Sequence, residues 1–307
     1  MNLIAIAISD LHLSLLRPAC RADKDWMQTQ ADYLDQVKTF KEELQEKECT
    51  PITLLCAGDI FDRWNASPEL INFALDHLPD DMICVPGQHD LPNHRMDQVH
   101  RSGYGVLVKA KKIRDISGQV TGNLGGFQVH GFGWGQPLTN SSNREGIEKK
   151  LHQVALIHQY CWVSDRCYPG APQEAHISSF KKQLEGFDVA VFGDNHIGFT
   201  AMLKRCNVLN TGGFIRRKSD EIGRTPSIGI IYEDGTVQLK KLDASIDEFQ
   251  NKPEDRPEVP LDLKSFMEGL EGLGEHGLNF IEAVENHLRR EDVDPQTKKI
   301  ILEVIGK

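Results

Sequence analysis

The chain has 307 residues, enough to bury a large hydrophobic core, and its formal net charge is −10. No apolar run approaches the roughly 20 residues of a membrane-spanning helix, and the N-terminal apolar run lacks the basic flank of a signal peptide. The seven cysteines are scattered, without a Cys-x-x-Cys pair, so disulfides and a structural zinc site are not expected. The sequence predicts a soluble, cytoplasmic protein.

The negative charge is concentrated late in the chain. Residues 245–307 hold 15 acidic and 8 basic side chains, which leaves 30 acidic and 27 basic ones for residues 1–244. A free-standing protein that binds duplex DNA usually has a basic excess. Divalent cations bound among the acids of the first part would bring that part close to neutrality. Nucleic acid is therefore not excluded as a partner.

Residues 1–244 alternate short apolar strands with helical stretches, which predicts an α/β domain. Strands are expected, in chain order, at Leu3–Ile8, Ile52–Ala57, Met82–Val85, Phe127–Phe132, Ala155–His158 and Val189–Phe192. Helices are expected around Asp23–Lys47, after Ser67 as N-cap with Pro68 at the first position, and around Gln173–Leu184. From Ala201 to Leu242 closely spaced strands indicate a meander, with a hairpin turn at Asp234-Gly235.

Near residue 245 the composition changes to a charged segment that contains three prolines. We interpret residues 245–260 as a linker, because proline and charge both disfavour compact packing. Residues 261–307 carry apolar side chains at helical spacing, which predicts a small helical module for docking onto a partner. The predicted organisation is therefore a domain over 1–244, a linker over 245–260 and a helical module over 261–307.

Polar side chains follow five of the predicted strands. They are Asp10 and His12; Asp59, Asp62 and Arg63; Gln88, His89 and Asp90; His158; and Asp194 with His196. Loops at the carboxyl ends of strands gather on one side of an α/β sheet, so these groups can converge. Carboxylates about 4 Å apart would repel by roughly 4 kcal/mol per pair at an effective dielectric of 20, and cations reverse that sign. Carboxylate, imidazole and amide ligands without thiolate favour an octahedral ion such as Mn²⁺.

The five segments, "DLH", "GDIFD", "GQHD", a lone histidine and "GDNH", resemble in order the signature of the calcineurin-like metallophosphoesterase superfamily. That signature is Asp-x-His, Gly-Asp-x-x-Asp, Gly-Asn-His-Asp/Glu, a lone His, and Gly-His-x-His. The resemblance implies a four-layer α-β-β-α sandwich that hydrolyses phosphoesters with two divalent metal ions.

The resemblance also implies a role for each matching residue. The first metal would be held by Asp10, His12 and His196, the second by Gln88, His158 and Asp194, and Asp59 would bridge both. A hydroxide bridging the two ions would attack the phosphorus. His89 would face the scissile phosphate, with the Asp62 carboxylate as its partner. Two positions depart from the pattern, since Gln88 replaces an asparagine and Asp194 replaces a histidine.

Within the superfamily, residues 1 to about 244 most resemble the SbcD-type DNA repair nucleases and their phage relatives, through "AGDIFD" and "NTGGFIRRKSDEIGRTPSIGIIYEDG". This resemblance implies a DNA exonuclease or end-processing enzyme in repair or recombination. Arg216, Arg217 and Lys218 lie on a loop suited to backbone phosphates, although a solvated turn explains the triplet equally well. An SMC-like ATPase subunit of the SbcC type and a second copy of the chain are the expected partners.

Three alternatives stay open. A phosphomonoesterase similar to the protein phosphatases is favoured by Arg63, which follows Asp62 as an arginine does in those enzymes. A small-molecule phosphodiesterase would use the same residues. A non-catalytic scaffold of the same fold would fit the departures at Gln88 and Asp194, but not the presence of His89 and Asp59.

Overall fold

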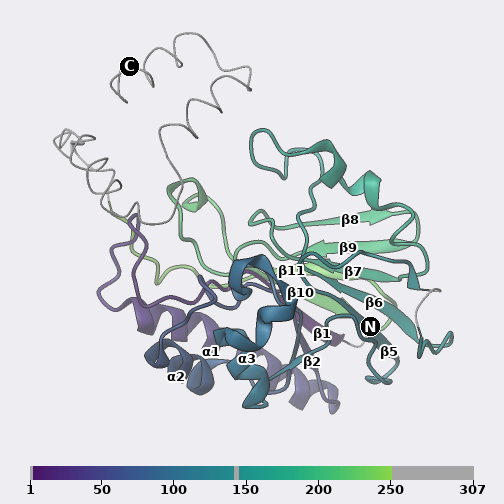
Figure 1. The fold of residues 1–307 in the computed structure, drawn as a ribbon, viewed down its shortest axis with the longest axis horizontal. Helices are drawn as coiled ribbons and strands as arrows, with labels where there is room; N and C mark the ends of the chain where they lie inside the picture. The colour runs from purple at the N-terminus through teal and green to yellow at the C-terminus, as the bar shows by residue number, and fades with distance from the viewer. Residues whose placement is uncertain (1–2, 142–144, 251–307) are drawn as a thin grey trace, which may run out of the picture. The chain divides into compact units, whose positions relative to one another are not determined.

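The computed structural model describes residues 3–141 and 145–250, all within one compact unit that extends from Met1 to Gln250 (Figure 1). Most of the predicted linker and the whole predicted helical module at 261–307 lie outside the described residues. None of the helices in the described part is both long and apolar enough to cross a membrane.

The first of two β-sheets has six strands in the order β11-β10-β1-β2-β3-β4. Strands β1 to β4 run parallel, while β10 is antiparallel to β1 and β11 antiparallel to β10. Their bounds are β1 Leu3–Ile8, β2 Thr53–Cys56, β3 Met82–Cys84, β4 Ile113–Asp115, β10 Ser227–Tyr232 and β11 Val237–Lys241. Ile8 pairs with Cys56 and Cys56 with Cys84, so the three central strands end at one level.

The second sheet has five strands in the order β5-β6-β7-β9-β8, parallel except for β8. Their bounds are β5 Phe127–Phe132, β6 His152–Ile157, β7 Val189–Phe192, β8 Phe199–Leu203 and β9 Cys206–Asn210. Ile157 pairs with Phe192, so β6 and β7 also end at one level. The aliphatic core between the two sheets is fully buried; it includes Ala7, Leu55, Val129, Leu156 and Leu209.

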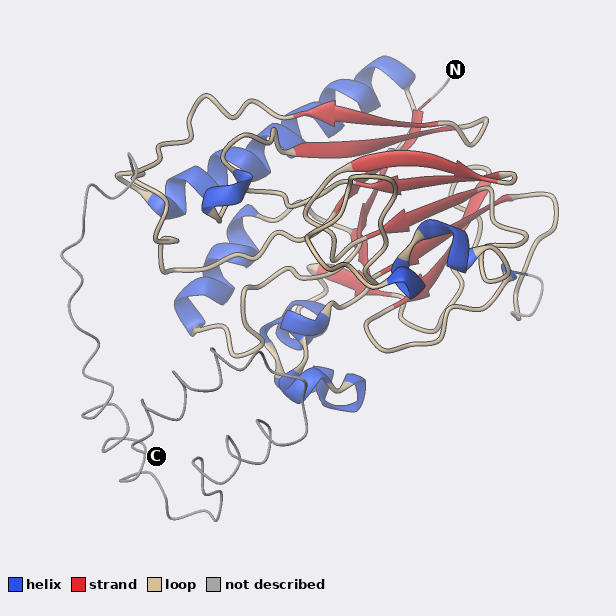
Figure 2. Ribbon diagram, turned by 90° about the horizontal axis from the view of Figure 1, so that it is seen from above, coloured by secondary structure: helices blue, strands red, loops and turns tan. Residues whose placement is uncertain are grey.

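Three α-helices in the described chain pack on the outer face of the first sheet, seen from above in Figure 2. They are α1 Trp26–Glu48, α2 Pro68–His77 and α3 Gly103–Lys109. The expected N-cap of α2 is confirmed, because the Ser67 hydroxyl accepts a hydrogen bond of 3.3 Å from the Leu70 amide. Helix α1 begins after Asp25, whose carboxylate accepts from the Gln28 amide at 2.9 Å.

The outer face of the second sheet is covered by 3₁₀ turns and loops rather than by the α-helix expected around Gln173–Leu184. That segment contains two short turns, Gln173–Ala175 and Ile177–Phe180, separated by His176 in an extended conformation. His176 is extended because its neighbours pair with Trp162: the Trp162 amide donates to Ala175 and the Ile177 amide donates to Trp162. The fold is thus the predicted mixed α/β sandwich of two parallel-rich sheets, with an irregular fourth layer.

Two further details bear on the expected meander. The hairpin turn at Asp234-Gly235 is confirmed, with Gly235 at φ 80° between β10 and β11. The strands after Ala201 do not form one meander, because β8 and β9 belong to the second sheet and β10 and β11 to the first.

Residues 245–250, assigned from the sequence to a linker, contact the domain. The Asp247 side chain is buried, and its carboxylate accepts hydrogen bonds of 2.7 Å from Arg21 and from Arg216. The Phe249 ring lies 4.8 Å from the guanidinium carbons of both arginines. The compact unit therefore includes these residues.

Candidate metal centre

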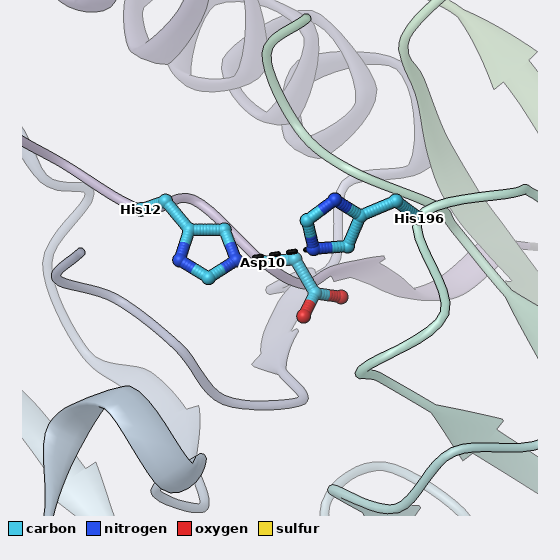
Figure 3. Close-up of side chains that lie close together, drawn as sticks. All are labelled: Asp10, His12 and His196. Carbon is cyan, nitrogen blue, oxygen red and sulfur yellow. Dashed lines mark hydrogen bonds between the residues drawn. The ribbon is translucent and has the colours of Figure 1, made fainter. Parts of the chain in front are cut away.

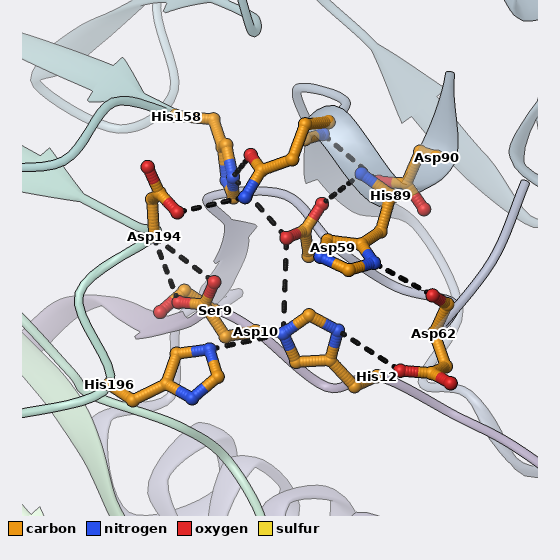
Figure 4. A network of polar contacts seen from close by, with 12 residues as sticks. Ser9, Asp10, His12, Asp59, Asp62, His89, Asp90, His158, Asp194 and His196 are labelled. Carbon is orange, nitrogen blue, oxygen red and sulfur yellow. Dashed lines mark hydrogen bonds and ion pairs between the residues drawn. The ribbon is translucent and has the colours of Figure 1, made fainter. Parts of the chain in front are cut away.

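The candidate site lies where the strands of both sheets end, and Figure 4 shows the side chains that meet there. In the first sheet, the loop after β1 runs beside the loop after β2: the Asp10 amide donates to Gly58 at 3.0 Å and the His12 amide to Asp59 at 2.9 Å. In the second sheet, Asp194 follows β7, and its amide donates to the Asp10 carboxylate at 3.1 Å. The two sheets thus bring the predicted residues together.

Glycines allow this close approach. A Cβ atom added at Gly58, which has φ 92°, would overlap the His158 ring, and one added at Gly87 would overlap the Asp59 carboxylate. Only a residue without a side chain fits at these two positions, because real side chains do not come so close. The glycines of "GDIFD" and "GQHD" are therefore needed for the geometry of the site.

Four of the predicted site residues have a left-handed backbone. They are Asp10 at φ 53°, His12 at φ 47°, Asp59 at φ 54° and Asp194 at φ 74°. Such conformations cost roughly 1 kcal/mol or more each in residues other than glycine, and they cluster at functional sites where the surrounding structure holds them in place.

The first group of candidate ligands is formed by Asp10, His12 and His196 (Figure 3). The Nε2 atoms of His12 and His196 lie 3.1 Å apart. His196 Nδ1 donates a hydrogen bond of 2.9 Å to Glu221 Oε1, so in the neutral ring Nε2 carries the lone pair. One carboxylate and two imidazoles therefore face one point, as a divalent cation requires.

The second group is formed by Asp10, Asp59 and His158. His158 Nδ1 donates to the main-chain oxygen of Ala57, which leaves Nε2 as the lone-pair nitrogen of the neutral ring. This Nε2 lies 3.5 Å from Asp59 Oδ2 and 2.7 Å from Gln88 Oε1. An imidazole, a carboxylate and an amide oxygen thus converge, which is a ligand set for a hard divalent cation.

The surroundings of Asp59 Oδ2 show whether these residues fit two metal ions. It is buried and has no hydrogen-bond partner among the described residues, although Asp59 Oδ1 accepts from the His89 amide at 2.9 Å. Oδ2 lies 3.8 Å from His12 Nε2 in the first group and 3.5 Å from His158 Nε2 in the second. An unpaired buried carboxylate oxygen is costly, and a cation on either side would satisfy it. The residues therefore fit a pair of divalent ions with Asp59 between them.

Burial and neighbouring charges shift the pKa values of the site residues. Burial raises the pKa of Asp10 to about 6 and lowers the pKa of His12 well below its usual value. Burial also opposes charge on Asp59 and His158, but their mutual attraction outweighs it: the pKa of Asp59 is lowered and that of His158 is raised. A positive charge beside Asp59 thus stabilises the site, and a metal ion can supply that charge in place of the His158 proton.

His89 is placed to act on a bound substrate. Its Nδ1 donates a hydrogen bond of 2.7 Å to the main-chain oxygen of Asp62, and the ring packs edge-on against His12 with centroids 4.8 Å apart. The sequence assigned the carboxylate of Asp62 to this role. That carboxylate is instead engaged by Arg217, whose Nη1 donates to Asp62 Oδ1 at 2.7 Å. Asp62 therefore orients His89 through its backbone.

Asp194 and Gln88, the two departures from the signature, contact each other. Gln88 Nε2 donates to Asp194 Oδ1 at 2.8 Å while Gln88 Oε1 faces His158. Asp194 contributes no atom to the candidate ligand groups found among the described residues. The structure places it beside the second group, and its assignment as a ligand stays a prediction.

The three arginines expected to bind substrate differ in position. Arg217 lines a cavity over the candidate ligands. Arg216 is held by Asp247 and by the main-chain oxygens of Ile222 and Ala244, at 2.7 and 3.1 Å. Arg63 is exposed and does not line this cavity. Of the three, only Arg217 lines the cavity over both ligand groups, while Arg216 lines a neighbouring cavity that His196 also lines.

Two buried acids at the site were not assigned a role from the sequence. Glu221 holds His196 and also accepts from the amides of Arg217 and Lys218 at 2.7 and 3.0 Å. Burial opposes its charge, but these donors lower the pKa of Glu221 to about 2. Asp90 accepts from the amides of Ile60, Phe61 and Gly87, which fixes two site loops to one another. No strand end or motif marks Glu221, because the contact depends on the path of the loop before β10.

A cavity of about 630 Å³ opens over these side chains. His12, Gln88, His89, Asp194 and His196 line it, together with Arg217. A cavity of this size over two candidate ligand groups and the His89 imidazole suits the hydrolysis of a bound ester.

Residues 5–198 match the family model described as calcineurin-like phosphoesterase. The chain therefore belongs to this family, and it is a metallophosphoesterase with candidate metal ligands in the positions described above. Members of the family hydrolyse phosphoester bonds and bind two divalent metals. A comparison with curated protein sequences gives no match.

The solved structures that match this chain are distant in sequence. The structure of TT1561 of Thermus thermophilus is 13% identical, with a TM-score of 0.44, and covers 78% of this chain and 99% of its own. A structure described as a novel archaeal phosphodiesterase is 13% identical, with a TM-score of 0.38 and the same coverage. Another crystal structure is 16% identical, with a TM-score of 0.47, and covers 78% of this chain and 98% of its own.

Proposed function

We propose that this protein is a metal-dependent phosphodiesterase that cleaves DNA, as an exonuclease or end-processing nuclease. The observation that carries the proposal is the unpaired Oδ2 atom of Asp59, which lies between an imidazole of each ligand group. Asp10, His12 and His196 would hold one divalent ion, and Gln88 and His158 the other, with Asp59 shared. Manganese fits this mixture of oxygen and imidazole ligands.

Individual residues of the chain would then have separate roles in the hydrolysis of a phosphodiester. Bound divalent cations supply Lewis acidity toward the phosphate and lower the pKa of the attacking water. Arg217, held by Asp62 at the edge of the cavity, attracts a phosphate oxygen. In its doubly protonated form, His89 keeps Nδ1–H on the Asp62 carbonyl, and its Nε2–H is free to give its proton to the leaving oxygen, which leaves the neutral ring.

The basic side chains around the cavity favour a nucleic acid diester as substrate over a small monoester. Arg217 and Lys218 come from one loop and both line the cavity. Arg63, which favoured the protein-phosphatase alternative, is exposed outside it. A polynucleotide offers phosphates on either side of the scissile bond, which such cations can bind.

The proposal is tested by assaying the purified full-length protein with manganese on linear DNA, bis(p-nitrophenyl) phosphate and p-nitrophenyl phosphate. We expect cleavage of DNA and of the chromogenic diester, and loss of DNA cleavage in His89→Ala. Turnover of the monoester without cleavage of DNA would contradict the nuclease proposal. No turnover together with no bound metal would favour the scaffold alternative.

An SMC-like ATPase subunit remains the proposed partner, and residues 261–307 the segment that would dock it. A pull-down of such a subunit with the full chain, and its loss after deletion of residues 261–307, would support this. Retention of the partner by the shortened chain would contradict it.

A further inference from the structure

Beyond the candidate ligands, the cavity has an aromatic wall. Trp134, from the loop after β5, and Tyr160 and Tyr168, from the loop after β6, all line it. The Trp134 ring lies edge-on to His158, with centroids 6.3 Å apart, and the Tyr160 and Tyr168 rings are tilted, with centroids 4.8 Å apart. The wall thus begins beside a candidate metal ligand and extends outward to Tyr168, which is 50% exposed.

Polar contacts hold the loops that carry the aromatic wall. Asn195, which lies between Asp194 and His196, is buried, and its Nδ2 donates to the main-chain oxygens of Cys161 and Arg166 at 2.7 and 2.9 Å. The Tyr168 amide donates to the Tyr160 hydroxyl at 3.2 Å. The Trp134 amide donates to Pro86 at 3.0 Å. These contacts tie the loops that carry the rings to Pro86 and Asn195, which lie next to the candidate ligands.

Three basic side chains of the loop between β9 and β10 line the same cavity, namely Arg217, Lys218 and Arg224. Arg217 and Arg224 are each paired with one acid, Asp62 and Asp220, at 2.7 and 3.5 Å. Lys218 is exposed and has no acidic partner among the residues that the structure describes. Its charge is therefore available to a phosphate.

A second cavity of about 400 Å³ shares His196, Ile197, Glu221 and Arg224 with the first. Arg166 and Lys241 contribute further positive charge to its walls. The two cavities thus adjoin at His196, and their basic side chains offer contacts to more than one phosphate of a nucleic acid strand.

We propose that the aromatic wall formed by Trp134, Tyr160 and Tyr168 binds an unpaired nucleobase next to the scissile phosphate, while Lys218 and Arg224 bind flanking phosphates of the same strand. Stacking on a side chain needs at least one face of the base to be free, and a base inside a duplex has both faces covered by its neighbours, so the substrate is a single-stranded segment or a frayed end. This inference rests on the proposed phosphodiesterase function and specifies the substrate of the same site.

The test measures binding and cleavage of a single-stranded oligonucleotide by the full-length protein, with and without an abasic position next to the cleaved phosphate. Binding is followed by fluorescence anisotropy in calcium, and cleavage in manganese. Tyr168→Leu is expected to weaken binding about tenfold, as loss of one stacked base does, and Tyr168→Phe to restore it. Lys218→Ala removes a charge proposed to bind a flanking phosphate and should weaken binding, whereas its matched control Lys149→Ala, at an exposed lysine before β6, should bind as the wild type does.

The losses of binding caused by the abasic position and by Tyr168→Leu should not be additive. If the ring stacks on that base, removing the base weakens wild-type binding about tenfold and weakens Tyr168→Leu no further. Full additivity, or unchanged binding by Tyr168→Leu, would overturn the stacking proposal while cleavage of the intact oligonucleotide still supported the phosphodiesterase function. Absence of cleavage of every diester by the wild type would instead refute the proposed function itself, and the stacking proposal with it.

Discussion

Gln88 Nε2 donates a hydrogen bond of 2.8 Å to Asp194 Oδ1, across 106 residues of sequence. These are the two positions at which the chain departs from the signature of its family. Because Asp194 holds the amide nitrogen, the amide oxygen of Gln88 turns to His158. An anion at position 194 thus compensates for the longer side chain at position 88 by fixing which end of the amide faces the second ligand group.

Asp194→Ala should therefore weaken the second metal without removing the first. Without its acceptor the Gln88 amide can rotate, and loss of such an orienting contact typically costs about 10- to 100-fold in metal affinity. Isothermal titration with manganese measures both sites. Asp194→Asn keeps an oxygen for the amide nitrogen and should lose less. Two unchanged tight sites in Asp194→Ala would contradict this role.

The effects of Gln88 and Asp194 on manganese affinity should also be coupled. Gln88→Ala alone removes the amide oxygen, after which Asp194→Ala has no amide left to orient. The summed affinity losses of the two single variants should then exceed that of the double variant, because residues in contact are not additive. Strict additivity in the same titration would mean that Asp194 acts independently of Gln88, for example as a ligand itself.

Glu221 should control the first metal through His196. Glu221→Ala leaves His196 Nδ1 without its acceptor and should reduce manganese affinity at the first site by about tenfold or more, whereas Glu221→Gln retains an oxygen and should lose less. Glu174→Ala, an exposed acid on a 3₁₀ turn, is the matched control. Equal affinities in all three variants would contradict the positioning role.

His89 should matter most for substrates with a poor leaving group. General acid catalysis contributes roughly 10²- to 10⁴-fold, and p-nitrophenolate leaves without the help of a proton whereas an alkoxide does not. His89→Ala should thus lower kcat about a thousandfold on an oligonucleotide and clearly less on bis(p-nitrophenyl) phosphate, with manganese binding retained. His100→Ala, an exposed histidine, is the control. Equal losses on both substrates would mean that His89 only binds the phosphate.

The buried Arg21 predicts the response of the fold to acid. Its Nε donates to Asp23 Oδ2 at 2.7 Å and its Nη2 to Asp247 Oδ1 at 2.7 Å. Burial opposes charge on Asp23, but Arg21 outweighs it and lowers the pKa of Asp23. A carboxyl whose pKa is lower in the folded state stabilises the fold fully above its unfolded pKa of about 3.9, and the stabilisation is lost as the pH falls through the folded pKa.

Asp23→Asn should accordingly reduce the free energy of unfolding by about 3 kcal/mol at pH 7, because it leaves part of a buried charge unpaired. The difference in Tm between wild type and variant should stay constant from pH 7 to pH 5 and shrink only below about pH 4. Asp35→Asn, which breaks an exposed ion pair with Lys38, should cost less than about 1 kcal/mol. A difference that already shrinks above about pH 5 would contradict the assignment to Asp23.

Much of the candidate site could be predicted because its residues follow strands with simple patterns. Leu3–Ile8, Phe127–Phe132 and Val189–Phe192 are strands with the expected bounds. A polar residue just after such a run lies at the carboxyl end of its strand. This rule predicted the positions of Asp10 and Asp194. The ordered motifs then led to Asp59, His89 and His158, which the structure brings to the same edge.

The rest depends on tertiary contacts that no local pattern records. Helix propensity in residues 173–184 is overridden where the chain pairs with Trp162. Arg216 and Arg217 are adjacent in sequence, yet one is held by Asp247 and the other by Asp62. Glu221 reaches His196 only through the path of its loop. Such pairings are set by which segments meet in space, so the sequence could supply candidates but not partners.

The central claim is that Asp59 is shared by two metal ions, and it is tested most directly by anomalous diffraction at the manganese edge from crystals grown with manganese. We predict two peaks per chain, one in contact with His12 and His196 and the other with Gln88 and His158, both in contact with Asp59 Oδ2. A single peak, or two peaks of which only one contacts Asp59, would contradict the claim.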